Sequence, residues 1–424
     1  MRVLPEGQYR WNFIVMGLDY SLFLLGLSFI SVYSVMPLFV HHLTSSNLAL
    51  GFISAVRSAG FLIPPILIAG YTERLHRTKP FLLAATTMER LPYLALALAI
   101  PLLAADHPTL LLWLFFAMVG TGSLFGGLGT GAWVDLLARM LPGDWRGRFF
   151  GLSAALGGLL GVAGGAGAAE ILHRYSWPTS FTICFACCFA VLVVSFVFIA
   201  LGREPLPKPV APPRSQAYWR GLPGLVRADR NFGFYLLATV FITMSGMAAS
   251  FYTVDAEKSL RLTDAGAGVY AIPLLVAATI GNVLWGYVGD HYGHKRTVEG
   301  GVLLTGLAAL LALGSHDPHW GVLAYGGVFV LTGLGSSAVQ LAALTFVIDF
   351  APPEQRPTYI GLATVVGAPF AFGAPLIGGA IADQAGYTSV FVLSLLLALI
   401  GVALVLFRVR DPRIAARRAG LAAR

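Results

Sequence analysis

The stretch of sequence that decides the fold is PGDWRGRFFGL, which runs from Pro142 to Leu152 between two long apolar segments. The chain returns to the same pattern at Pro352–Leu362, where it reads PPEQRPTYIGL. Both stretches place a proline, an acid, an arginine, an aromatic residue and Gly-Leu in one register, and they start 352 − 142 = 210 residues apart in a chain of 424. A polar loop that returns after half a chain predicts a duplicated unit.

The composition indicates the environment of the fold. Hydrophobic residues make up 57% of the chain and charged residues 11%, whereas a soluble domain carries roughly 25% charged residues. Since so few charges cannot cover a water-soluble surface, we expect an integral membrane protein. The three cysteines, Cys184, Cys187 and Cys188, share one apolar run, and we interpret them as small buried side chains rather than as metal ligands.

Twelve apolar runs are long enough to cross a bilayer, which takes roughly 20 residues. Helices are expected because lipid offers no hydrogen-bond partners to a strand edge. The first run is too long for the core of a cleaved signal peptide, so we interpret it as the first crossing. The runs are 11–40, 48–70, 81–104, 110–134, 150–172, 179–201, 231–254, 265–288, 298–315, 320–348, 358–382 and 389–408.

The basic residues predict the orientation of these crossings. If the N-terminus is cytoplasmic, most of the 28 lysines and arginines fall on the cytoplasmic side, and the outer loops hold only Arg174, Lys258 and Arg261. This asymmetry follows the positive-inside rule. It predicts a multi-pass protein of the inner (cytoplasmic) membrane with both termini in the cytoplasm. Because the net charge of +8 is spread over many loops, no nucleic-acid partner is expected.

The longest polar segment divides the chain into two halves. Gly202–Arg230 is rich in proline at its start and lies between the sixth and seventh runs. We therefore expect an N-terminal six-helix half at 1–201, a cytoplasmic linker at 202–230, and a C-terminal six-helix half at 231–424 with a short basic tail. The repeated loop then joins the fourth and fifth crossings of each half.

A second pair of loops carries a family resemblance. GYVGDHYGHKR (286–296) follows the eighth run, and AGYTERLHRTK (69–79) follows the second. Here the chain resembles the major facilitator superfamily of secondary transporters, which carries G-x-x-x-D-[RK]-x-G-[RK]-[RK] in both loops. The matching residues are Gly286, Asp290, Gly293, Lys295, Arg296, Glu73, Arg74, Arg77 and Lys79, whereas His291, His294, Ala69 and His76 depart from the pattern.

The opening pair of loops is also similar to a motif of this family, P-x-[DE]-x-R-G. Asp144 and Arg146 match it in the first copy, and Glu354 and Arg356 match it in the second, where Pro357 replaces the glycine. The resemblance implies an all-α fold of twelve transmembrane helices in two pseudo-repeated halves. It also implies a gating role for the loop of Asp290, because a carboxylate there can accept hydrogen bonds from a helix N-terminus or pair with arginine.

Ionisable residues inside the predicted crossings are the sharpest functional signal, because each is costly unless it is paired or hydrated. Asp19, Arg57, Glu89 and Arg90 fall at similar depth in the first three runs, and we expect them to form a buried charge network for proton or substrate coupling. Asp19 is the expected proton carrier, with Arg57 as its partner, since the resemblance places the first crossing along the central cavity. A static ion pair is the alternative for Glu89 and Arg90.

The second half holds no lysine or arginine within its predicted crossings. Tyr252, Asn282, Trp285 and Gln340 are expected to line a cavity there with hydroxyl, amide and aromatic groups. These groups favour an amphipathic or uncharged organic substrate. The sequence shows no nucleophile–base pair, no phosphate-binding loop and no metal-ligand cluster, so we expect no enzyme activity, no cofactor and no metal.

These observations predict a secondary transporter, with proton-coupled efflux of amphipathic compounds as the first hypothesis. Proton-coupled uptake of a sugar or organic acid is the alternative, and a membrane receptor or enzyme is a remote third. The expected partners are a small-molecule substrate, protons and the lipid bilayer, and a monomer is expected.

Overall fold

The computed structural model describes residues 5–72, 75–205, 229–315, 320–351 and 356–412, and these residues form helices and connecting turns without a β-strand. The side chains of residues 63, 65–72, 143–144, 147, 265, 290, 344 and 356–358 are not described. The first half comprises α1 (Glu6–Ser28), α2 (Val35–Leu43), α3 (Asn47–Thr72), α4 (Lys79–Leu103), α5 (Pro108–Met140), α6 (Gly143–Arg174) and α7 (Thr179–Leu201).

The second half begins with α9 (Arg230–Ser245), η1 (Gly246–Ser250), α10 (Tyr252–Leu260) and α11 (Asp264–Gly268). It continues with α12 (Ala271–Tyr292), α13 (His294–Leu313), α14 (Gly321–Phe350) and α15 (Arg356–Phe407). Most of the predicted linker, residues 206–228, lies outside the described part of the chain.

Within the described residues, ten helices are long and apolar enough to cross a membrane, and α3 contains the shorter apolar helix Asn47–Leu62. The apolar stretch Tyr359–Phe407 has 49 residues, about 70 Å as a straight helix, against a hydrocarbon core of about 30 Å. Gly386 divides it, with φ 76° and ψ 172°, a conformation that glycine adopts without a Cβ clash. The helices are therefore consistent with the twelve predicted crossings.

Two of the predicted crossings are interrupted rather than continuous. The run at 11–40 consists of α1 and α2, because Pro37 has no N–H to continue a helix from the preceding turn. The run at 231–254 changes from α9 to η1 at Gly246–Ser250, a segment of mostly small residues. Both breaks occur in the first crossing of a half, so the duplication includes them.

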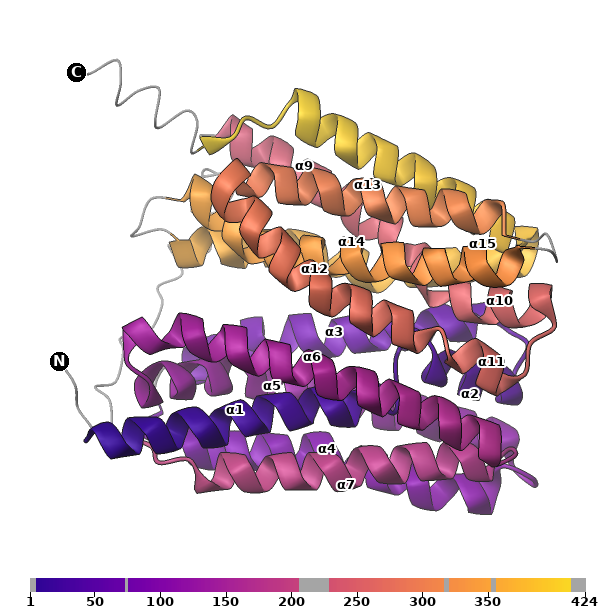
Figure 1. Cartoon of the computed structure of the whole chain (residues 1–424), viewed down its shortest axis with the longest axis horizontal. Coiled ribbons are helices and arrows are strands. Elements are labelled where there is room, and N and C mark those ends of the chain that lie inside the picture. The colour runs from indigo at the N-terminus through magenta and orange to yellow at the C-terminus, as the bar shows by residue number, and fades with distance from the viewer. Residues whose placement is uncertain (1–4, 73–74, 206–228, 316–319, 352–355, 413–424) are drawn as a thin grey trace.

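The two halves lie side by side, and both described ends of the chain emerge at one end of the bundle (Figure 1). We call this the terminal end and the opposite one the distal end. Between the halves, α3 packs along α15 and α6 packs along α12. The backbones meet closely: a Cβ on Gly51 would lie 2.0 Å from the Pro375 carbonyl oxygen, and one on Gly158 would lie 2.4 Å from Thr279 Oγ1. Close packing between the halves therefore explains glycines in α3 and α6.

The duplication extends to side-chain contacts at the terminal end. Asn12 of α1 donates to the Arg203 carbonyl oxygen at 3.0 Å and accepts from the Arg203 N–H at 2.8 Å. Asn231 of α9 makes the same two bonds with Arg410, at 2.9 and 2.8 Å. In each half an asparagine on the first helix thus holds the chain just after the last helix.

A second repeated contact joins the helix that begins after each family-motif loop to the next helix in the chain. Thr78 at the start of α4 donates to Asp135 of α5 at 2.8 Å. His294 at the start of α13 takes the equivalent place, with its Nδ1 2.8 Å from Asp349 of α14. The histidine that departs from the family pattern therefore makes the contact that a threonine makes in the first half.

Candidate functional site

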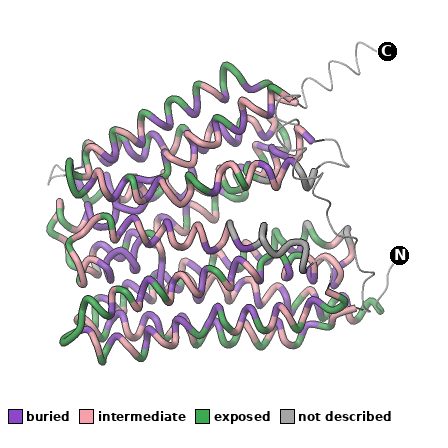
Figure 2. The backbone as a smooth tube through the Cα atoms, turned by 180° about the vertical axis from the view of Figure 1, so that it is seen from behind, coloured by how far each residue is buried: buried purple, intermediate pink, exposed green. Residues whose placement is uncertain are grey.

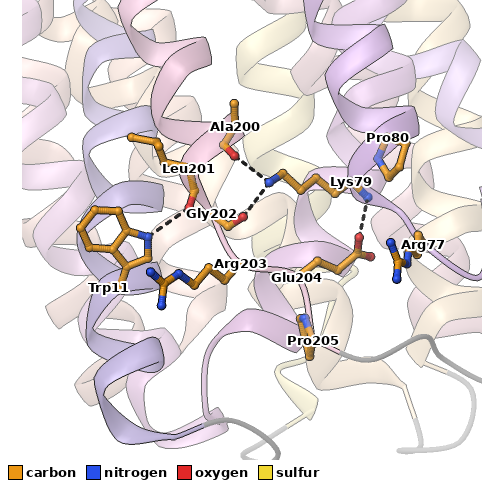
Figure 3. A pocket seen from close by; sticks show the side chains of 10 residues that line it. All are labelled: Trp11, Arg77, Lys79, Pro80, Ala200, Leu201, Gly202, Arg203, Glu204 and Pro205. Carbon is orange, nitrogen blue, oxygen red and sulfur yellow. Dashed lines mark hydrogen bonds between the residues drawn. The ribbon is translucent and has the colours of Figure 1, made fainter.

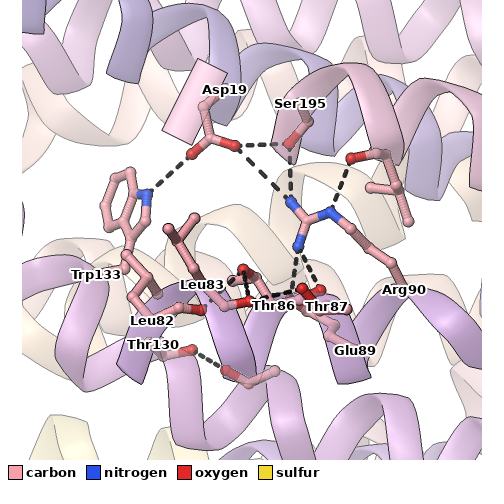
Figure 4. A network of polar contacts seen from close by, with 12 residues as sticks. Asp19, Leu82, Leu83, Thr86, Thr87, Glu89, Arg90, Thr130, Trp133 and Ser195 are labelled. Carbon is pink, nitrogen blue, oxygen red and sulfur yellow. Dashed lines mark hydrogen bonds and ion pairs between the residues drawn. The ribbon is translucent and has the colours of Figure 1, made fainter. Parts of the chain in front are cut away.

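The buried charges of the first half surround a cavity of about 210 Å³. The cavity lies inside this half, between α1, α4, α5 and α7, with one residue from α3. Figure 4 shows the polar contacts of its charged residues. Its walls combine two carboxylates and a guanidinium with aromatic and small residues. They are Asp19, Tyr20, Phe23, Phe61, Leu82, Thr86, Glu89, Arg90, Gly126, Gly129, Thr130, Trp133, Val134 and Ile199.

Asp19 is surrounded by hydrogen-bond donors. The Ser195 hydroxyl of α7 donates to Oδ1 at 2.6 Å, and the Trp133 indole N–H of α5 donates to Oδ2 at 3.0 Å. Arg90 Nη2 lies 4.0 Å from Oδ1. With 3% of its surface exposed, this carboxylate is removed from water, and its donors stabilise a negative charge there.

Arg90 is held on several sides, so its position is fixed. Its Nε donates to the Leu192 carbonyl oxygen of α7 at 2.8 Å, and Nη1 donates to the Thr86 carbonyl oxygen at 2.9 Å. Nη2 donates to Ser195 Oγ at 3.0 Å. Since Ser195 in turn donates to Asp19, this hydroxyl connects the two charges. The network joins α1, α4 and α7.

Glu89 is bound much less completely than Asp19. Among the described residues its one polar contact is Arg90 Nη1, 3.5 Å from Oε2. It is equally removed from water, with 6% of its surface exposed. Its carboxylate faces α5, where a Cβ on Gly126 would lie 2.6 Å from Oε1. Glycine at 126 therefore makes room for the carboxylate.

Arg57 occupies a different place from the one expected. Its guanidinium lies over the ring of Phe61, 5.3 Å from the ring centre. Within the described part of the chain, no carboxylate oxygen lies within 4.0 Å of it, and Arg90 takes the place beside Asp19 that was predicted for Arg57. The reason is that Arg90 extends from α4 between α1 and α7, whereas Arg57 reaches from α3 towards Tyr93 and Glu89 of α4.

Two residues of this site were not found from the sequence. Trp133 is the one tryptophan in a glycine-rich part of α5, and Ser195 is the one hydroxyl in the apolar run VLVVSFVF. A polar group that stands alone in such a run needs a partner inside the membrane. A lone polar group in an apolar run was therefore the available signal. It indicates that the group is hydrogen-bonded, but it does not indicate the partner.

The two halves are connected at the distal end by a set of contacts that we call the distal latch. Asp383 of α15 accepts hydrogen bonds from the backbone N–H groups of Asn47 and Leu48, at 2.7 and 3.0 Å, and from the Ser46 hydroxyl at 3.2 Å. These N–H groups form the start of α3. A carboxylate of the second half thus caps a helix of the first half.

Consecutive histidines of α2 complete the distal latch. His42 Nε2 lies 2.6 Å from Asp264 Oδ2 of α11, and His41 Nδ1 lies 3.2 Å from Glu257 Oε2 of α10. Buried residues run between the halves at this end (Figure 2). By contrast, the hydrogen bonds that described residues make with each other at the terminal end stay within one half. The distal end is therefore closed in this conformation.

The predicted gating loop of the second half makes contacts within that half. Lys295 lies 3.5 Å from Glu299 and donates to the Leu406 carbonyl oxygen at 3.4 Å, while Arg296 lies 3.7 Å from Glu299. Gly293 has φ 93°, a conformation that accounts for glycine there. Gly286 lies on α12. The Asp290 side chain, and Glu73 and Arg74 of the first copy, lie outside the described part of the structure.

The other repeated loops are described in part. Arg146 donates to the Ala138 carbonyl oxygen, so it binds the end of α5. Asp144 and Arg356 lie on α6 and α15 with side chains outside the description, and Glu354 lies wholly outside it. Their predicted role remains a prediction.

The residues expected to line a cavity in the second half fall into two groups. Tyr252 is 2% exposed and packs against Phe391, with ring centres 5.2 Å apart. Trp285 is 9% exposed, and its indole N–H donates to a backbone carbonyl of α14 at 2.8 Å. Packing therefore places both in the core of this half rather than at a cavity wall, which corrects the prediction. Asn282 and Gln340 are exposed.

The chain is similar in sequence to proteins of several bacteria. An uncharacterized protein of Mycobacterium tuberculosis is 23% identical over 274 residues, which cover 60% of this chain and 50% of that protein. A gentisate transporter of Corynebacterium glutamicum is 32% identical over 128 residues, 30% and 28% of the two chains. A methyl viologen resistance protein of Salmonella typhimurium is 28% identical over 186 residues, 43% and 36%. The chain spans about half the length of the first of these relatives, and less of the others.

The fold is similar to that of solved transporters. The crystal structure of a D-xylose-proton symporter superimposes with a TM-score of 0.73 at 15% identity, covering 94% of this chain and 98% of that one. The family model of the Major Facilitator Superfamily matches residues 19–279 and 257–422. Together with the duplicated membrane helices, this match shows that the chain belongs to the Major Facilitator Superfamily.

Proposed function

We propose that the protein is a proton-coupled secondary transporter that exports a small amphipathic compound by alternating access. The observation that carries the proposal is the buried cluster of Asp19, Arg90 and Glu89. The membership in a transporter family and the one-sided closure of the distal end support alternating access. With both termini cytoplasmic, as the basic residues predict, this conformation faces inward.

Within 4.0 Å of one another the cluster holds two acids and one base, and Arg57 acts on Glu89 from a greater distance. Asp19 and Glu89 carry two negative charges when ionised, and Arg90 carries one positive charge. A buried charge without a partner is strongly unfavourable, so a bound proton balances the cluster better than a second free carboxylate does. The cluster can therefore take up and release one proton as its surroundings change.

The hydrogen bonds favour Glu89 as the residue that carries this proton. Asp19 accepts from Ser195 and Trp133 and lies near Arg90, so its negative charge is stabilised. Glu89 has the single long contact with Arg90. We thus propose that Asp19 stays ionised as the partner of Arg90 and that Glu89 exchanges the proton, which modifies the expectation from the sequence.

Movement of the helices would then link the proton to transport. Arg90 is bonded to α7 through Leu192 and Ser195, and Asp19 is carried by α1. A shift of α1 against α4 and α7 changes the distance between Asp19 and Arg90, whereas Glu89 stays beside Arg90 on α4. When Asp19 moves away from Arg90, the ionised form of Glu89 becomes the partner of Arg90 and the proton leaves.

The direction and the substrate are proposed from two sources. Aromatic side chains border the cluster, including Tyr20, Phe23 and Trp133, and such walls favour an amphipathic compound. The similarity to a methyl viologen resistance protein supports export. The similarity to a gentisate transporter favours a second candidate, uptake of an organic acid with a proton.

Transport by the purified protein in proteoliposomes tests these two candidates, with methyl viologen and gentisate as probe compounds. An exporter that exchanges its substrate for protons should accumulate methyl viologen in vesicles with an acidic interior, because protons leave as the compound enters. A symporter should accumulate gentisate when the exterior is acidic. If the accumulation of both compounds is independent of the imposed pH gradient, neither proton exchange nor proton symport of these substrates is supported.

A further inference from the structure

A second recess lies at the terminal end of the first half, away from the charge cluster. It has a volume of about 580 Å³ and is formed by the start of α1, the start of α4, the end of α7 and the residues that follow α7. Figure 3 shows side chains from these segments around it. In the bundle, α4 and α7 lie on the side of the first half that is remote from the second half (Figure 1).

Two arginines border this recess without a carboxylate partner among the described residues. Arg77 precedes α4 and is exposed, and Arg203 follows α7 and is exposed. The guanidinium of Arg203 lies over the indole ring of Trp11, 5.6 Å from the ring centre. The indole N–H in turn donates to the Leu201 carbonyl oxygen at 3.0 Å. Trp11 therefore holds one guanidinium at the rim.

Glu204, the one acid that lines the recess, already accepts hydrogen bonds from other groups. Glu204 accepts from Arg139 at 2.6 Å and from the backbone N–H groups of Thr78 and Lys79 at 2.8 and 3.3 Å. The Lys79 ammonium donates to carbonyl oxygens of α7 and of the residue after it, at 2.6 and 2.8 Å. Since Arg139 balances Glu204, the recess keeps an excess of positive charge.

The position of the recess specifies the kind of anion. It lies where three membrane helices begin or end, which is the depth of the lipid headgroups. Trp11 and Leu201 beside it are 39% and 46% exposed, so apolar surface adjoins the cationic rim on the bilayer side. Tryptophan and arginine at helix ends are typical of the membrane interface, and basic recesses between helices bind anionic headgroups.

We propose that this recess binds the phosphate of an anionic phospholipid, with Arg77 and Arg203 as its two charged ligands. Arginine suits this role because its planar donors bind phosphate oxygens in pairs. The recess is separate from the cavity around Asp19. The proposal is therefore independent of proton coupling and of the substrate.

Binding of phosphatidylglycerol to the delipidated protein in detergent, measured by native mass spectrometry, tests the proposal. Phosphatidylcholine and soluble glycerol phosphate serve as the comparison ligands. Each basic residue near a membrane surface contributes about a fivefold preference, so the double variant Arg77→Gln/Arg203→Gln should bind phosphatidylglycerol about thirtyfold more weakly.

The duplication supplies a matched control. Arg408 lies over the ring of Phe234 at 5.4 Å, as Arg203 lies over Trp11, but in the second half. Arg408→Gln should leave phosphatidylglycerol binding unchanged. Melting temperatures without added lipid establish that the variants are folded, and the single variant Arg77→Gln replaces the double variant if the latter unfolds.

Three results would overturn the proposal. The first is equal binding of phosphatidylglycerol by the wild type and the folded arginine variant. The second is equal weakening by Arg408→Gln, which would indicate general attraction to basic helix ends. The third is equally tight binding of soluble glycerol phosphate, which would make the recess a site for a free organic phosphate rather than for a lipid.

Discussion

Replacing Asp383 should loosen the distal latch by a measurable amount. Its carboxylate accepts three hydrogen bonds from the start of α3 in the other half. Asp383→Asn keeps one acceptor oxygen but removes the charge, which at an exposed helix N-terminus contributes up to about 1 kcal/mol. The ratio of distally open to closed molecules should therefore rise about fivefold. Asp383→Ala also removes the cap, about 1 kcal/mol more, and should raise the ratio about thirtyfold.

Labelling of a buried cysteine at this interface measures the change. Ser250 of η1 is 4% exposed and contacts Ser54 of the other half at 2.8 Å. In a background without the native cysteines, Ser250→Cys should react faster with a membrane-impermeant maleimide in the order wild type, Asp383→Asn, Asp383→Ala. Asp106→Asn, an exposed acid in another connecting turn, is the control. Equal labelling rates in all four proteins would refute the assignment of Asp383 to the latch.

Further predictions concern the packing and bonding of the charge cluster. Gly126→Ala should lower the free energy of unfolding by about 1–3 kcal/mol, because its Cβ would lie 2.6 Å from Glu89 Oε1. In thermal unfolding, Gly129→Ala should be milder, since the nearest atom to its Cβ lies at 3.7 Å, and equal melting temperatures would contradict this account. Trp133→Phe removes a donor to Asp19 and should cost about 1.5–3 kcal/mol. An unchanged denaturation midpoint in Trp133→Phe would show that this bond contributes nothing.

The depth of the buried charges could be predicted from the sequence, but their partners could not. Residues at known distances from a helix end lie at known depths, because the rise per residue is fixed at about 1.5 Å. That places Asp19, Arg57 and Arg90 at similar levels. Which guanidinium faces Asp19 depends on how each helix is rotated, and packing sets that rotation. Arg90 therefore replaced Arg57 as the neighbour of Asp19.

The second half shows the same limit. Tyr252 and Trp285 are amphipathic, so their composition suits a cavity wall as well as a core. Tyr252 begins α10, after the helix has changed from α9 to η1. The apolar run at 231–254 gives no sign of that change in its sequence. The duplication was more informative, because the two halves repeat the contacts of Asn12 with Arg203 and of Asn231 with Arg410.

The two carboxylates of the cluster should respond differently to neutralisation. Asp19→Asn leaves Glu89 as the one carboxylate beside Arg90, so Glu89 should ionise there, and the loss of the charged acceptor of Ser195 and Trp133 should cost about 1.5–3 kcal/mol. Glu89→Gln reproduces the protonated side chain and should fold normally. Thermal unfolding of both variants checks this asymmetry, and equal destabilisation would mean that the proton is shared.

The most direct test of proton coupling is transport by Glu89→Gln in proteoliposomes with and without an imposed pH gradient. The account predicts that this variant still exchanges labelled for unlabelled substrate across the membrane, because alternating access is intact. It also predicts that the pH gradient no longer drives accumulation, because the group that carries the proton is gone. Full accumulation driven by the gradient in Glu89→Gln would contradict the assignment of the proton to Glu89.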